Sequence, residues 1–119
     1  MRLNEVVHTD AMPVEGYGPG FFRVGGQVHE GALYLSPDGV QRWGGLEDTA
    51  PFRHDTIDVL FLGMGAEIAH APAAFRAEIE ARGIGLEVMS SPAACRTYNV
   101  LLSEGRRVGL ALLPVVPTA

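Results

Sequence analysis

The chain has 119 residues, a formal net charge of −5, one cysteine and a hydrophobic fraction of 47%. This length accommodates one domain with a single core, which we expect to span residues 1–119. The negative charge argues against a nucleic-acid surface, and a lone cysteine excludes an internal disulfide and a cysteine-rich zinc or redox motif.

Charged side chains begin the sequence, with Arg2, Glu5, His8 and Asp10 in the first ten residues, and predict no signal peptide. The longest apolar runs are shorter than the ~20 residues of a membrane helix. We therefore expect a cytoplasmic protein that does not insert into a membrane. All basic residues are arginine, which excludes chemistry based on a Schiff-base or P-loop lysine.

The first half of the chain predicts an antiparallel β-meander. Residues 1–20 are glycine-punctuated and expected to be irregular, with 1–14 and 115–119 as irregular termini. Short strands are expected at 21–24, 32–36 and 40–43, with turns at 25–26 and 37–39 between them.

The second half alternates strand and helix. Continuous apolar runs at 58–62 and 86–89 predict strands covered on both faces, and 108–113 a last strand. Helices are expected at 72–82, before Gly83, and from Ser91-Pro92 to about Glu104. This order favours an α/β fold with a mixed, mostly parallel sheet, which the meander either extends or covers as another layer.

Two glycines and a serine are expected at the carboxyl ends of neighbouring parallel strands, where α/β sheets form pockets. Gly63 and Gly65 would let backbone approach a ligand, and free amides at the start of the helix at Ser91 would attract an anion. The alternative is a tight strand-to-loop turn. Either way, Gly63, Gly65 and Ser91 should lie side by side.

Three further candidates follow on the same helix. Cys95 lies near the positive helix end, which would lower a thiol pKa, but we favour a buried, unreactive side chain. Arg96 and Asn99 are three residues apart and could bind an anion or a partner's carboxylate, or clamp neighbouring loops. The histidines are scattered, so we predict no metal site, no cofactor and no catalytic residue.

Several segments resemble one small family. They are Tyr17, Gly20-Phe21, Val24, Gly26, Trp43, the run from Asp58 to Gly65, Gly83-Ile84, Glu87-Val88-Met89 and the run from Ala94 to Arg106. The chain is similar over about residues 15–116 to the Mth-domain family, which includes a mitochondrial complex I assembly factor and an adipogenesis-associated protein. The ending Ala111-Leu112-Leu113-Pro114 is closer to the assembly-factor branch.

The resemblance implies a three-layer α/β fold without established catalysis or cofactor, and a role in building a respiratory or membrane complex through protein partners. Two hypotheses follow. The first is a non-catalytic assembly or interaction domain. The second is a small-molecule or anion-binding protein, or an enzyme, using a cleft at Gly63, Gly65, Ser91, Cys95 and Arg96. The first is favoured because no triad, paired-carboxylate or metal pattern is present in the sequence.

Overall fold

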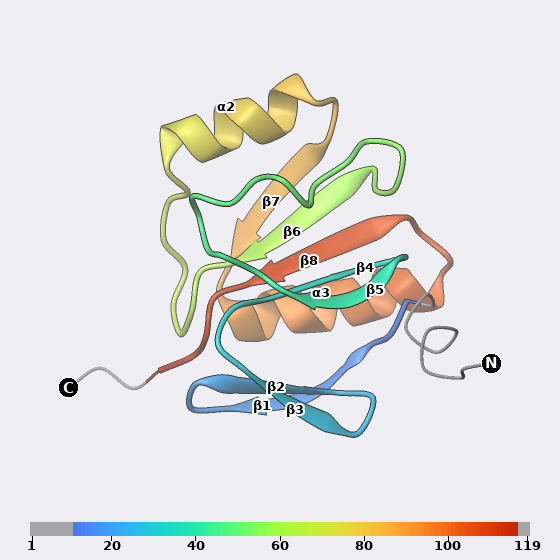
Figure 1. The fold of residues 1–119 in the computed structure, drawn as a ribbon, viewed down its shortest axis with the longest axis vertical. Coiled ribbons are helices and arrows are strands. Elements are labelled where there is room, and N and C mark those ends of the chain that lie inside the picture. Colours follow the sequence, from blue (N-terminus) through green and yellow to red (C-terminus); the bar gives the residue numbers. More distant parts are fainter. Residues whose placement is uncertain (1–10, 117–119) are drawn as a thin grey trace.

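The computed structural model of the protein describes residues 11–116 (Figure 1). Its strands are β1 (Val14–Gly18), β2 (Phe21–Val24), β3 (Gln27–Glu30), β4 (Leu33–Ser36), β5 (Gly39–Arg42), β6 (Val59–Gly63), β7 (Gly85–Met89) and β8 (Val108–Leu112). Its helices are α2 (Ala73–Ala81) and α3 (Ser91–Ser103). The α/β class is confirmed, and in the second half each element lies within a residue or two of its predicted bounds.

The larger sheet has five strands in the order β5-β4-β8-β6-β7. Strand β6 is parallel to β7 and β8, whereas β4 is antiparallel to both β5 and β8. The sequence predicted a mostly parallel sheet, but parallel pairings are not in the majority. The difference arises because the β4–β5 hairpin extends the sheet by pairing with the last strand, β8.

The N-terminal strands form a separate sheet in the order β1-β2-β3, so the predicted meander is divided between two sheets. Residues 14–18 form a strand where irregular chain was expected, and β3 was missed entirely. Strand β3 has no buried side chain, which removes the alternation that marks a strand. Gly18 does not interrupt β1. The Phe21 ring of β2 occupies the position that a side chain of residue 18 would take.

The two helices lie on opposite faces of the five-stranded sheet (Figure 1). Helix α2 connects β6 to β7, and α3 then leads back past β6 to β8. Because these crossovers run in opposite directions across the sheet, one handedness places the helices on different faces. Each helix buries one apolar stripe, with Phe75 and Ile79 on α2 and Ala94, Cys95 and Tyr98 on α3.

Two apolar clusters fill the faces. The first lies between α3, the small sheet and the five-stranded sheet, and its buried residues are Val14, Phe22, Val24, Leu33, Leu35, Phe61, Ala94, Cys95, Tyr98, Val108, Leu110 and Leu112. The second lies beneath α2 and includes Tyr34, Trp43, Phe52, Ile57, Leu60, Leu62, Phe75, Ile79, Ile84, Leu86 and Ala111. Side chains alternate between the clusters along β4, β6 and β8, as the pleat requires.

Strand β6 is buried over most of its length, as predicted. Strand β7 was expected to be covered on both faces. It lies instead at the edge of the sheet and is partly exposed. Its Gly85 and Glu87 are exposed, while Leu86 is buried towards α2. Within residues 11–116, no helix has both the length and the apolar character needed to cross a bilayer.

Candidate functional site

Gly63, Gly65 and Ser91 meet where β6 ends and α3 begins. The Ser91 hydroxyl accepts a hydrogen bond from the Gly65 amide at 2.9 Å and donates one to the Leu113 carbonyl at 2.7 Å. A side chain on Gly63 would lie 2.6 Å from the Ser91 Oγ and 2.7 Å from its Cα. The prediction that these residues lie side by side is confirmed, and the close backbone approach is between β6 and α3.

The amides at the start of α3 have partners within the protein. The Ser91 N–H donates to the Gly65 carbonyl at 2.7 Å, and the Ala94 N–H to the Ser90 carbonyl at 2.9 Å. The Ala93 N–H donates to the Ser90 side chain at 3.3 Å, and Pro92 has no N–H. The expectation of free amides at this helix start was therefore wrong, because the Gly65 backbone and the Ser90 cap satisfy them.

Cys95 lies in the core formed by α3, with 5% of its surface exposed. Burial raises the pKa of its thiol from 9.0 to about 12, against the opposing effect of the Arg96 charge. The buried position is the one that we favoured, and the pKa shift is opposite to that expected from the helix end alone. Arg96 itself is exposed and directed away from this core.

Asn99 connects α3 to the small sheet. Its Oδ1 accepts from the Val14 N–H at 2.9 Å, and its Nδ2 donates to the Val14 carbonyl at 2.9 Å. The oxygen and the nitrogen of the Asn99 side chain thus both bond to the main chain of one residue of β1. Of the predicted site residues, the structure brings Gly63, Gly65 and Ser91 together, while Cys95 is buried in the core, Arg96 is exposed and Asn99 binds β1.

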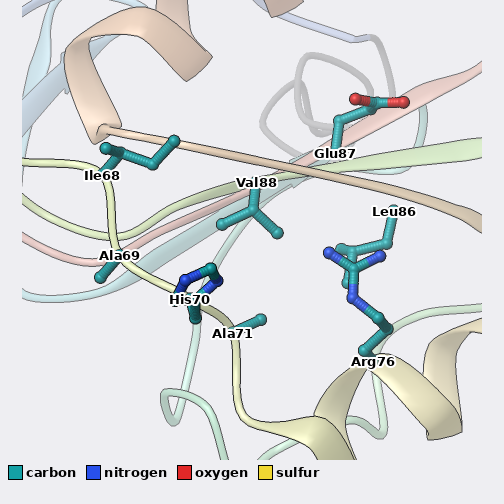
Figure 2. A pocket seen from close by; sticks show the side chains of 8 residues that line it. All are labelled: Ile68, Ala69, His70, Ala71, Arg76, Leu86, Glu87 and Val88. Carbon is teal, nitrogen blue, oxygen red and sulfur yellow. The ribbon is translucent and has the colours of Figure 1, made fainter.

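A cavity that the sequence did not suggest lies beside β7. It has a volume of about 550 Å³ and is lined by Ile68, Ala69, His70, Ala71, Arg76, Leu86, Glu87 and Val88 (Figure 2). Leu86 and Val88 point towards the side on which His70 and Arg76 lie, whereas Glu87 points the opposite way (Figure 2). The lining comes from three elements: β7, α2 and the segment between β6 and α2.

The segment before α2 is exposed from residue 66 to 70. Ile68 has 71% of its surface exposed, the highest value among the large apolar side chains that the structure describes. One signal in the sequence could have indicated this surface. It is an isoleucine that stands between Glu67 and His70, in a long connection between a strand and a helix. We call the cavity and its lining the β7 trough.

Among residues 11–116, no group of three or more histidine, cysteine, aspartate or glutamate side chains could hold a metal ion. The two buried polar atoms without a hydrogen-bond partner among the described residues are the hydroxyls of Tyr34 and Tyr98, in the two cores. Burial raises the pKa of both phenols.

Comparison with known proteins places these features in a family. An uncharacterized protein of Rhodobacter capsulatus is 52% identical over the full length of both chains. The zebrafish and human proteins named NADH dehydrogenase [ubiquinone] 1 alpha subcomplex assembly factor 3 are 32% and 29% identical over 85% and 89% of this chain. This chain covers 63% and 62% of those two proteins, slightly less than two thirds of their length.

Solved structures show the same fold. A Bartonella henselae protein described as an outer membrane protein matches 91% of this chain and 98% of its own, with 33% identity and a TM-score of 0.83. A Mth938-like domain of Bordetella pertussis matches 99% of this chain and 95% of its own, with 28% identity and a TM-score of 0.72. Residues 14–113 match the model of a family described as protein of unknown function (DUF498/DUF598). The chain therefore belongs to the DUF498/DUF598 family.

Proposed function

We propose that this chain is a non-catalytic assembly factor that binds protein partners during the building of a respiratory or other membrane complex, and that it acts from the cytoplasm. The observation that carries the proposal is the similarity, over most of the chain, to proteins named as assembly factors of NADH dehydrogenase. The single cysteine, a free and buried thiol, is compatible with a reducing compartment.

The surface around Ile68 supports the proposal from the structure. Ile68, with 71% of its surface exposed, lies beside a trough lined by Ala71, Leu86 and Val88, and together they give a partner protein an apolar surface to pack against. The alternative cleft at the start of α3 has less support, because the polar atoms of Ser91 and the first amides of the helix are engaged in the fold.

Deletion of the gene in the organism that encodes this chain tests the role. We expect mature NADH dehydrogenase on native gels to decrease and subcomplexes to accumulate, with the wild-type gene restoring the complex. The proposal is wrong if complex levels are unchanged and the tagged protein purifies without any subunit of a membrane complex.

A matched pair of surface variants places the contact. Ile68→Glu should lose the co-purifying subunit and fail to restore the complex, because it puts a charge at the trough. Val100→Glu is the control, since Val100 is also exposed, at 57%, but lies on α3. Equal effects of the two substitutions would mean that the partner does not bind at Ile68.

A further inference from the structure

The main chain of β7 has an open side, and two hydrogen bonds define which residues face it. The Gly85 N–H donates to the Asp58 carbonyl at 3.0 Å, and the Met89 carbonyl accepts from the Met64 N–H at 2.8 Å. Both partners flank β6, so Gly85, Glu87 and Met89 direct their main-chain groups towards that strand. Main-chain direction alternates along a strand, and Leu86 and Val88 therefore direct N–H and C=O groups outwards.

These outward groups have no strand beside them among the described residues, because β7 ends the order of the sheet. The same two residues line the β7 trough with their side chains. Ala71 and His70 lie across from Val88, and Arg76 of α2 lies next to Leu86 (Figure 2). The trough of about 550 Å³ thus brings an apolar floor next to the outward main-chain groups of β7. The Arg76 guanidinium lies beside them and pairs with Glu80 at 3.2 Å, an exposed contact that a carboxylate of a bound segment can replace.

We infer that the β7 trough binds an extended segment of a partner protein, which adds to the sheet as a sixth strand beside β7. Its main chain pairs with Leu86 and Val88. One apolar side chain of the segment packs on Leu86, Val88 and Ala71, and a carboxylate two residues away binds Arg76. The inference rests on the proposed function, which it deepens by naming the kind of segment that is bound.

The structure favours a single extended segment over a second copy of this chain. Residues 68–71 line the trough together with β7, so the edge of another sheet brought to β7 would meet this segment, whereas a single extended segment is small enough to enter the cavity. A second copy would also bring its own 68–71 segment to the same edge. Pairing of two β7 strands about their centre would in addition place Glu87 opposite Glu87, a repulsive cross-strand contact.

Amide hydrogen exchange on the free protein tests the geometry first. We expect the Leu86 and Val88 amides to exchange rapidly and the Glu87 amide, which is directed to β6, to be protected. The probe for binding is a displayed library of random nine-residue peptides. Selected peptides should contain an apolar residue followed two positions later by aspartate or glutamate, and should slow exchange at Leu86 and Val88 without changing Glu87.

A matched pair of variants isolates the main-chain contact. Val88→Pro removes the outward N–H and the valine side chain, whereas Val88→Ala removes only the side chain. We expect the selected peptides to bind Val88→Pro about tenfold more weakly than Val88→Ala, the effect of one lost hydrogen bond. Thermal unfolding of both variants establishes whether each is folded, and the exchange measurement on wild-type protein decides the question if Val88→Pro is not.

The remaining outcomes overturn the inference. Peptides that bind without protecting Leu86 and Val88, or a library that yields no binder, exclude strand addition while leaving the proposed function to be judged by the deletion strain. Protection that increases with protein concentration, together with a doubled mass in sedimentation, would mean that a second copy fills the edge.

Discussion

Asn99 holds the small sheet against α3 through both polar atoms of its side chain, and this is a role for one residue that can be measured. Asn99→Ala removes the two hydrogen bonds to Val14 and leaves main-chain groups at the β1 edge without these partners. We expect a loss of about 1–3 kcal/mol in unfolding free energy, measured by urea denaturation. Arg96→Ala is the control, since Arg96 is exposed and should change stability by less than about 0.5 kcal/mol. Equal stabilities for the two variants would mean that the amide does not hold β1.

The buried thiol of Cys95 should resist chemical modification in the folded protein. With its pKa raised to about 12 by burial, the thiol stays protonated and enclosed near neutral pH, so a disulfide reagent should label it only after urea unfolding. Rapid stoichiometric labelling of the native protein would contradict the burial.

The same shift predicts a pH dependence of stability. In the unfolded chain the thiol ionises from its ordinary pKa of 9.0, below its folded value of about 12. Its contribution to stability is therefore complete below pH 9 and is lost as the pH rises towards 12. We expect the urea midpoint to fall over this range, and to fall less in Cys95→Ala. The same slope in both proteins would assign the decrease to the two buried tyrosines, whose pKa values are also raised.

At the scale of elements, the junction of β6 and α3 depends on Gly63. A methyl group at this position would lie 2.6–2.8 Å from atoms of Ser91 and Leu112. Because two of those contacts involve Ser91, one of them its backbone, Gly63→Ala should cost about 1–3 kcal/mol in thermal or urea unfolding. Gly16→Ala in β1 has no atom within 4 Å of the new methyl group and is the matched control, expected to be near neutral. A neutral Gly63→Ala would show that α3 can move away from β6.

Arg82, which follows α2, fixes the long connection between β5 and β6. Its guanidinium donates to the carbonyls of Thr49 and Phe52 and also contacts Glu78. We expect Arg82→Ala to lose about 1.5–3 kcal/mol and to speed proteolysis within residues 44–57. Arg53→Ala provides the comparison, because its pair with Asp55 is exposed on both sides and should contribute little. Unchanged proteolysis in Arg82→Ala would show that other contacts hold the connection.

The elements that could be predicted from sequence are those with a repeating apolar pattern. Helices α2 and α3 and strands β6, β7 and β8 each show a continuous or periodic apolar run. Strands β1 and β3 do not show such a run. Glycines interrupt the apolar pattern of β1, where the ring of Phe21 covers Gly18, and β3 has no buried side chain. Neighbouring positions for Gly63 and Ser91 followed from parallel topology.

Other features depend on contacts between distant segments and have no local pattern. The Ser91 amide at the start of α3 bonds to the backbone carbonyl of Gly65, a partner that no local pattern around Ser91 indicates. The edge position of β7 depends on where β8 enters the sheet, and the β7 trough exists only because the segment before α2 passes beside that edge. Strands can therefore be predicted from local apolar patterns more readily than their order in the sheet.

At the scale of the whole molecule, the order β5-β4-β8-β6-β7 places the last strand of the chain at the centre of the larger sheet. Strand β8 pairs with β4 on one side and β6 on the other, and all five of its residues are buried. Within the larger sheet, the two halves of the chain are thus joined by the pairing of β8 with β4, while α2 and α3 cover the sheet from opposite faces.

This placement has a consequence for synthesis on the ribosome. Strand β4, with four buried residues, is made early but has only the β5 hairpin to pair with until residues 108–112 have left the exit tunnel. Until then, the edge of β4 that pairs with β8 in the folded protein has no partner strand. Unpaired apolar edges of this kind lead nascent chains to aggregate or to recruit chaperones. The larger sheet is completed only once Val108–Leu112 has emerged, and a ribosome stalled before Val108 would hold a chain in which β4 and β6 cannot yet be joined.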